Sequence, residues 1–241
     1  MKLHGLRWWV IALVCLATII NYIDRSALGI MWPAMSEDLG LTKGDYAWII
    51  NIFTITYAAG KFISGKLYDK VGTKIGFVLS IFFWSLASVL HFFAKGAASL
   101  GIFRGLLGVA EAGNWPGAVK NNAEWFPIKE RGLAQGIFNS GAAIGSIVAA
   151  PIVSGLFESF DWKWTFVIIG FVGFLWIIPW LIFNKKKPNE HPWITDEERD
   201  YILSDSPKKE NAQAEGKSLS VIKILSYKES WGAISARFFI E

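Results

Sequence analysis

The feature that most constrains this chain is a series of six apolar runs, each long enough to cross a lipid bilayer. A membrane-spanning helix needs roughly 20 consecutive, mostly apolar residues. The runs cover residues 8–31, 46–66, 75–94, 99–122, 132–157 and 164–183. Of all residues, 53% are hydrophobic and 18% are charged, whereas ordinary soluble domains have roughly 25% charged residues. The sequence therefore predicts an all-α membrane protein rather than a soluble protein with six buried helices.

The chain divides into three parts. Residues 1–183 hold the six runs, residues 184–228 are polar, and residues 229–241 begin another apolar stretch. The stretch SPKKENAQAEGKS in the polar part is poor in apolar residues, and we expect it to be flexible. Before it, ITDEERDYIL predicts a surface helix with Thr195 as N-cap and with Glu198 completing a capping box. Because residues 229–241 are too short to span a bilayer, we expect the chain to finish inside a seventh helix.

The distribution of charge in the loops predicts the orientation. Lysines and arginines gather at the N-terminus and in loops 66–74, 129–131 and 185–187, while the opposite loops are mostly acidic. Since cytoplasmic loops are enriched in Lys and Arg, we expect the N-terminus and the polar part to be cytoplasmic. The same clustering makes the net charge of +4 a signal of topology rather than of a nucleic-acid surface.

A few charged residues interrupt the apolar runs. A charge at the centre of a membrane helix costs roughly 2.5–3.5 kcal/mol on insertion scales, so such residues are candidates for function. Asp24 and Arg25 point about 100° apart on a helix and each needs a partner elsewhere. Arg104 and Glu111 are seven residues apart and share a helix face. Interhelical ion pairs that only hold the bundle together are the alternative, and Lys61 is placed to extend toward the headgroups.

The loop after the second run reads GKLYDKVGTK, residues 65–74. This stretch resembles the loop signature of the major facilitator superfamily. The resemblance implies a cytoplasmic conformational lock that opens during transport. The residues that fill the signature and would form the lock are Gly65, Asp69, Lys70, Gly72 and Lys74, together with Leu67.

Other stretches resemble one branch of this superfamily. NYIDRS, FRGLLGVAEAGNWPGAVK, EWFPIKERGLAQGIFNSG and ITDEERDYI are similar to those of anion:cation symporters, and most similar to hexuronate permeases. Such proteins are multi-pass proteins of the inner (plasma) membrane with twelve spans in two six-helix halves. The resemblance implies that this chain is the N-terminal half with the start of helix 7, and that a missing C-terminal half is its intramolecular partner.

The resemblance also implies a function, the proton symport of a sugar acid such as galacturonate or glucuronate. The substrate is a small organic anion, and Arg25 and Arg104 are the expected ligands of its carboxylate because a guanidinium binds carboxylates in a bidentate way. Asp24 and Glu111 match the carboxylates that couple transport to the proton. The residues expected to hydrogen-bond the sugar are Tyr57, Asn21, Asn114 and Asn139.

Two other interpretations stay open. One is an inactive truncated fragment, and the other is a symporter of a different organic anion, such as an aldonate, a tartrate-like acid or glucarate. The sequence offers no metal-ligand cluster, nucleophile motif or phosphate-binding loop. We therefore expect no enzymatic activity, no cofactor, no metal and no nucleic-acid partner.

Overall fold

The structure is a computed structural model that describes residues 2–204, 226–232 and 235. The chain forms two units, Met1–Ser204 and Asp205–Glu241. The elements of the first unit are α1 (Leu6–Leu39), α2 (Lys43–Leu90), η1 (His91–Phe93), α3 (Ala97–Glu111), α4 (Asn114–Trp125), η2 (Ile128–Glu130), α5 (Arg131–Phe183), η3 (Pro188–Glu190) and α6 (Asp196–Leu203). In the second unit, residues 228–232 and 235 are helical. The segment that we expect to be flexible and most of the seventh helix lie outside the described residues.

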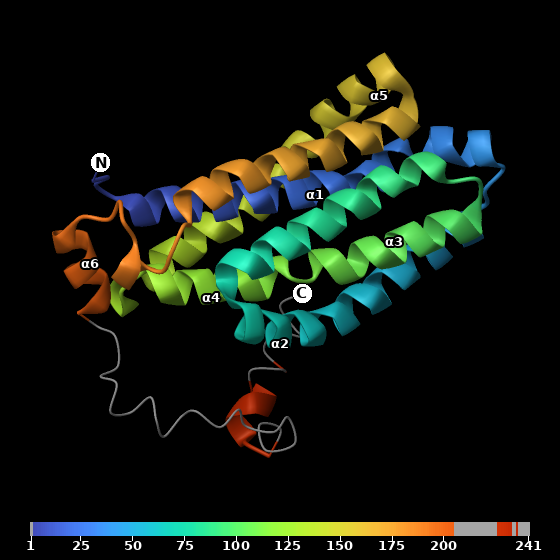
Figure 1. Ribbon diagram of the computed structural model, residues 1–241. Helices are drawn as coiled ribbons and strands as arrows, with labels where there is room; N and C mark the ends of the chain where they lie inside the picture. Colours follow the sequence, from blue (N-terminus) through green and yellow to red (C-terminus); the bar gives the residue numbers. More distant parts are fainter. Residues whose placement is uncertain (1, 205–225, 233–234, 236–241) are drawn as a thin grey trace. The chain divides into compact units, whose positions relative to one another are not determined.

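Three described stretches are long and apolar enough to cross a membrane, namely Leu6–Leu39, Lys43–Phe93 and Ile128–Phe183. The last two contain 51 and 56 residues, and straight helices of that size would be about 75–85 Å long, more than twice the hydrocarbon thickness of a bilayer. Each is interrupted by one residue with a positive φ, Gly72 (79°) in α2 and Asp161 (72°) in α5. Figure 1 shows both helices doubling back, so each supplies two of the predicted spans.

The fourth predicted span is a pair of helices rather than one continuous helix. α3 ends at Glu111 and α4 starts at Asn114, and α4 continues across the bundle from α3 (Figure 1). Pro116 lacks the N–H that would bind the carbonyl oxygen of Ala112, four residues earlier. That oxygen instead accepts a hydrogen bond from Ser64 Oγ at 3.3 Å. The break therefore falls in the middle of the span, immediately after Glu111.

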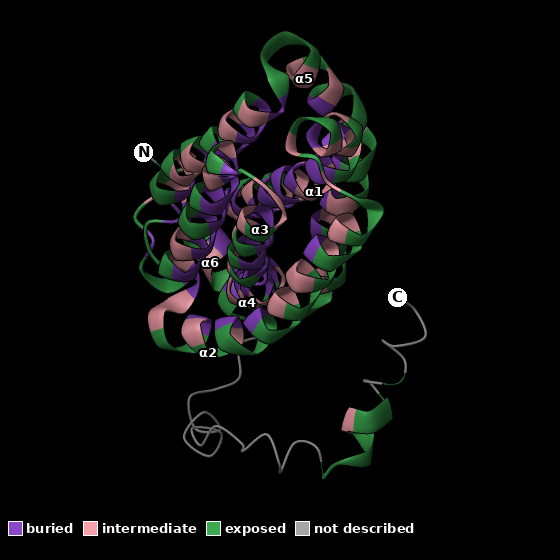
Figure 2. Cartoon of the chain, turned by 90° about the vertical axis from the view of Figure 1, so that its right-hand side faces the viewer, coloured by how far each residue is buried: buried purple, intermediate pink, exposed green. Residues whose placement is uncertain are grey.

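The core of the bundle lies between α1, α2 and α5, where buried residues face inward (Figure 2). α1 packs closely against the first arm of α5 because glycines remove side chains from the contact. A Cβ atom on Gly145 would lie 2.8 Å from the carbonyl oxygen of Ile19, and one on Gly141 would lie 2.7 Å from that of Cys15. The small residues at these two positions therefore serve close helix packing.

Tyr68, near the end of the first arm of α2, is fully buried against three glycines. A Cβ atom on Gly76 or Gly117 would lie 2.5 Å from the Tyr68 ring or hydroxyl, and one on Gly113 would lie 3.4 Å from the ring. Its hydroxyl donates a long hydrogen bond to Ser80 Oγ at 3.5 Å. The ring therefore fills the space between the second arm of α2 and the break that separates α3 from α4.

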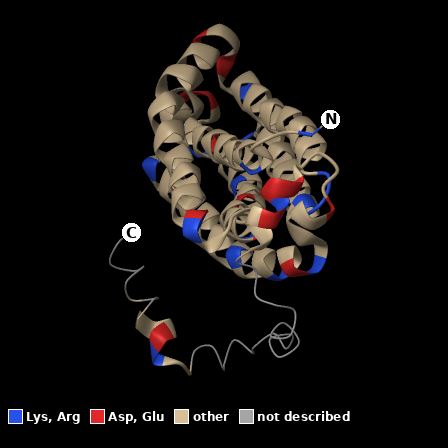
Figure 3. Cartoon of the chain, turned by 90° about the vertical axis from the view of Figure 1, so that its left-hand side faces the viewer, with Lys and Arg blue, Asp and Glu red and all other residues tan. Residues whose placement is uncertain are grey.

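The segment after α5 folds back onto the end of the bundle that holds the N-terminus, where charged residues gather (Figure 3). Leu3 pairs with Ile194 in an isolated parallel bridge. Thr195 caps α6 as predicted, because its Oγ1 accepts the N–H of Glu198 at 3.3 Å. A capping box also needs a bond from the Thr195 N–H to the Glu198 carboxylate, and this part of the prediction is wrong.

The Glu198 carboxylate caps α1 instead of α6. It accepts the N–H groups of Leu6 at 3.1 Å and Arg7 at 3.2 Å, and it pairs with the Arg7 side chain at 2.9 Å. Arg7 also pairs with Glu130 at 3.0 Å. Because free N–H groups at a helix start favour a carboxylate, Glu198 fixes α6 to the start of α1.

Candidate functional site

The charged residues of three spans meet near the middle of the bundle. Arg25 of α1 donates from Nε to Glu111 Oε2 of α3 at 2.7 Å, and Glu111 is fully buried. The Arg25 guanidinium also lies 4.2 Å from the centre of the Tyr57 ring, on the first arm of α2. Arg25, Glu111 and Tyr57 therefore form one cluster of an ion pair and an aromatic face.

Asp24 points away from Arg25 and takes a different partner. Its Oδ1 accepts a hydrogen bond from Ser88 Oγ at 3.1 Å, on the second arm of α2, and its Oδ2 is buried without a partner among the described residues. Arg104 and Arg25 both lie within electrostatic range of Asp24. The neighbouring Asp24 and Arg25 therefore serve two separate pairs, as the 100° between them requires.

Arg104 is a buried cation with free donors. Only 2% of the residue is exposed, and within the described part of the chain its Nε and Nη2 have no hydrogen-bond partner. Its guanidinium lies 5.5 Å from the Phe166 ring. Because an unpaired buried charge is costly, a group with these free donors is suited to receive an anion.

The three asparagines differ in their positions. Asn21 is fully buried on α1, within reach of the Glu111 carboxylate. Asn114 donates to Thr18 Oγ1 at 3.1 Å, which is a helix–helix bond. Asn139 is exposed on α5 and accepts from Gln135 of the same helix at 3.1 Å. Of the three, Asn21 is the one that lies beside Glu111.

The predicted lock residues lie around the turn between the two arms of α2. Gly72 has the positive φ that reverses the chain, a conformation that other residues rarely adopt. Asp69 pairs with Lys120 of α4 at 2.9 Å, and Lys74 donates to the carbonyl of Lys185 at 3.0 Å. No side-chain contact of Lys70 is described, and the space beside Gly65 is open. The turn is thus tied to α4 through Lys120.

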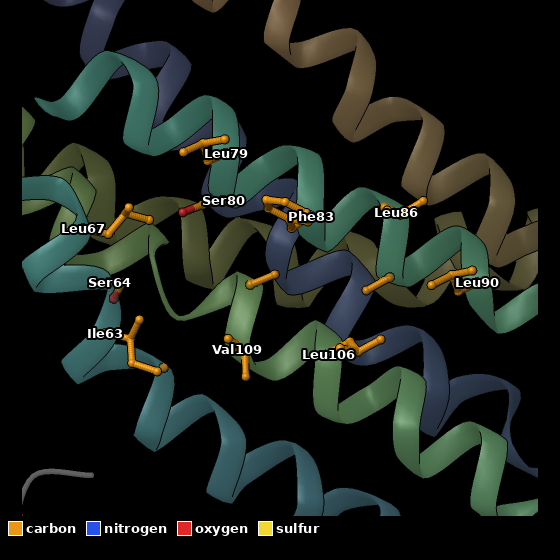
Figure 4. A pocket seen from close by; sticks show the side chains of 13 residues that line it. Ile63, Ser64, Leu67, Leu79, Ser80, Phe83, Leu86, Leu90, Leu106 and Val109 are labelled. Carbon is orange, nitrogen blue, oxygen red and sulfur yellow. The ribbon is translucent and has the colours of Figure 1, made fainter. Parts of the chain in front are cut away.

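A separate apolar cavity of about 410 Å³ lies between the two arms of α2 and α3. Figure 4 shows its lining, which is aliphatic and aromatic apart from the hydroxyls of Ser64 and Ser80. No charged side chain lines it. Because a sugar acid needs charged and polar ligands, this cavity is not the candidate site, and the charged cluster is.

Sequence reasoning missed Ser88 in the charged cluster and Lys120 beside the turn, and it directed Lys61 toward the headgroups. Ser88, the partner of Asp24, lies in a span where a serine gives no signal by itself. Lys120, the partner of Asp69, lies far from the loop signature in sequence. Lys61 contacts the Tyr57 ring at 4.7 Å from its Nζ, so it points toward the cluster rather than toward the headgroups.

The chain is similar in sequence to several named transporters. The chain is 35% identical over 240 residues to a hexuronate transporter of Escherichia coli (strain K12), covering 100% of this chain and 55% of the relative. It is 34% identical to a galacturonate transporter of Dickeya chrysanthemi, covering 100% of this chain and 69% of the relative. A probable galactarate/D-glucarate transporter of Bacillus subtilis (strain 168) is 32% identical, covering 99% of this chain and 55% of the relative. The chain thus spans about half the length of most of these relatives.

The fold is also similar to that of solved structures. A bacterial homolog of the human lysosomal transporter Spinster, in an inward-facing and unoccupied conformation, matches with a TM-score of 0.68 and 21% identity, covering 79% of this chain and 45% of that one. The prediction of a six-helix N-terminal half with several membrane spans is confirmed by this likeness and by the relatives. Because a model of the Major Facilitator Superfamily matches residues 14–240, this chain belongs to that superfamily of membrane transporters.

Proposed function

We propose that this chain forms the first half of a transporter that carries a sugar acid, such as galacturonate or glucuronate, together with a proton. The observation that supports the proposal most is Arg104, a buried guanidinium whose donors have no partner within the described residues. The names of the relatives point to the same class of substrate. A carboxylate of the substrate would bind Arg104, and Asn21 and Tyr57 would hydrogen-bond its hydroxyl groups.

Proton coupling follows from the pairing of the charges. Arg25 holds Glu111 at 2.7 Å, so an anion that approaches Arg25 competes with the Glu111 carboxylate. A Glu111 that has lost its cation and gained a negative neighbour binds a proton, which keeps the charge of the site balanced. Anion and proton therefore favour the binding of each other, and the effect is reciprocal. Asp24, which lies within the field of Arg104, would respond in the same way.

The proposal includes an orientation and a partner. The N-terminus, the turn at Gly72 and α6 would face the cytoplasm of a cell whose inner membrane holds the protein, in agreement with the Lys and Arg at that end. A second six-helix half would close the open side of the charged cluster and supply the remaining ligands of the sugar.

Uptake measurements test the proposal. The gene that contains this sequence, from its own start codon to its own stop codon, is expressed in cells that lack endogenous uptake of galacturonate. We expect accumulation of labelled galacturonate that an uncoupler of the proton gradient abolishes. Accumulation that depends on sodium and persists with the uncoupler would contradict proton coupling. The absence of any sugar-acid uptake by correctly inserted protein would contradict the proposed function itself.

A further inference from the structure

We propose that Lys61 is a third cation of the substrate site and that it selects sugar acids with two carboxylates over those with one. This inference rests on the proposed function, because it assigns a specificity to the same charged cluster. It concerns a residue that the loop signature does not include. The position, the direction and the pairing of Lys61 each support it.

Lys61 lies deep in its helix. The first arm of α2 runs from Lys43 to the interruption at Gly72, so its middle falls near Tyr57, and Lys61 is one helical turn beyond it. Ten residues, or about 15 Å along the axis, separate Lys61 from Val71 at the end of the arm. A positive charge at this depth is costly to insert and is retained where it serves a function.

The side chain also points in the wrong direction for snorkelling. A lysine that extends to the headgroups would direct its ammonium group toward the turn at Gly72. Lys61 instead places its Nζ 4.7 Å from the centre of the Tyr57 ring, which lies one turn back toward the helix middle. The same ring has the Arg25 guanidinium at 4.2 Å. Two cations therefore share one aromatic ring, and repulsion between them favours an anion nearby.

The pairing leaves the charge of Lys61 available. Arg25 has Glu111 as its counter-ion, and Asp24 lies in the field of Arg104. Among the described residues, Lys61 pairs with no carboxylate, and its ammonium contacts the Tyr57 ring.

Three cations (Arg25, Arg104 and Lys61) and two carboxylates (Asp24 and Glu111) give the cluster a net charge of +1. When one carboxylate takes up a proton, the net charge becomes +2. A substrate with two carboxylates neutralises that charge, whereas a uronate leaves a charge of +1, so the charge balance favours one carboxylate at the arginines and a second one at Lys61.

Galacturonate and galactarate test this directly, because they share stereochemistry and differ by a second carboxylate at the other end of the chain. Competition by each unlabelled acid is measured against uptake of labelled galacturonate in cells that express the gene described above. For Lys61→Gln we expect the inhibitory concentration of galactarate to rise about tenfold or more, since one charge-assisted contact is lost. That of galacturonate should change by less than about threefold. Lys61→Arg should keep the preference for the diacid.

Lys66→Gln is the matched control, because it removes a positive charge from the same helix farther from the Tyr57 ring. It should leave both concentrations unchanged. The inference is overturned if Lys61→Gln shifts both acids equally or neither of them, or if galactarate does not compete in the wild type. If the wild type takes up no sugar acid, the proposed function fails, and binding of galactarate to purified wild-type and Lys61→Gln protein decides about Lys61 separately. Galacturonate uptake by the variant also shows that it is folded.

Discussion

Replacement of Arg104 by alanine is the strongest test of the anion site. The free Nε and Nη2 of Arg104 can donate two charge-assisted hydrogen bonds to one carboxylate. At about 1.5–3 kcal/mol for each bond, their loss weakens binding by about 3–6 kcal/mol. This corresponds to an increase in Kd of roughly a hundredfold to ten-thousandfold. The Nε and Nη2 donors have no hydrogen-bond partner in the described structure, but Arg104→Ala also removes a positive charge near the buried Asp24, so the thermal stability should fall.

Calorimetry with galacturonate on the purified protein measures the Kd, and thermal unfolding of the same sample measures stability. Arg104→Lys is the matched variant, since it keeps the positive charge but loses the planar pair of donors. We expect it to bind more weakly than the wild type and more tightly than Arg104→Ala. A Kd of Arg104→Ala within threefold of the wild-type value, with cooperative unfolding, would refute the role of Arg104 as a carboxylate ligand.

Three further predictions concern the proton, the cap of α1 and pH. Glu111→Gln should keep the exchange of bound sugar acid but lose its proton-driven accumulation, and normal accumulation would place the proton elsewhere. Glu198→Gln should lower the free energy of unfolding by about 1–2 kcal/mol and speed hydrogen exchange of the Leu6 amide, because the charged cap of α1 is lost. Burial, with nearby cations, lowers the pKa of His191 from its ordinary value of 6.5, so its contribution to stability is present above about pH 6.5 and lost as the pH falls. The Trp193 N–H donates to His191 Nδ1 at 3.2 Å. The hydrogen-exchange protection factor of this amide, which is its intrinsic exchange rate divided by the observed rate, should therefore fall as the pH is lowered from 7.5 to 5.5. In His191→Asn this protection factor should not change with pH.

The sequence was sufficient for the spans and for four of the buried or half-buried charges, namely Asp24, Arg25, Arg104 and Glu111. Apolar runs longer than about 20 residues have few alternatives in a bilayer, and intramembrane charges stand out against them. Heptad spacing also placed Arg104 and Glu111 on one face of the fourth span. The structure breaks that span near its middle, and Pro116 accounts for the break because its missing N–H is a local property of the chain.

The partners of these residues could not be read from the sequence. Whether Arg25 pairs with Glu111 depends on how α1 and α3 are rotated against each other, which no local pattern specifies. The contact of Ser88 with Asp24 likewise depends on how the second arm of α2 packs against α1. Glu198 has the spacing of a capping box. Its carboxylate nevertheless accepts three hydrogen bonds from Leu6 and Arg7 at the start of α1, whereas a capping box would give it the single N–H of Thr195.

Asn139 lies apart from the charged cluster. An asparagine in a span suggested a ligand of the sugar, but the structure places it on the exposed face of α5, bonded to its own helix. Its part in substrate binding stays a prediction that depends on what covers this face.

The packing of Tyr68 has a mechanical consequence. The residue precedes Asp69, which holds Lys120, and its ring is lodged against Gly113, two residues after Glu111. A single rigid side chain therefore joins the turn at one end of the bundle to the helix break beside the buried carboxylate. A large shift of the turn at Gly72 would displace the Tyr68 ring from its contacts with Gly113 and Gly117. A rearrangement of the break between α3 and α4 would likewise move this ring. Displacement at the membrane surface and rearrangement at the middle of the bilayer are in this way parts of one movement.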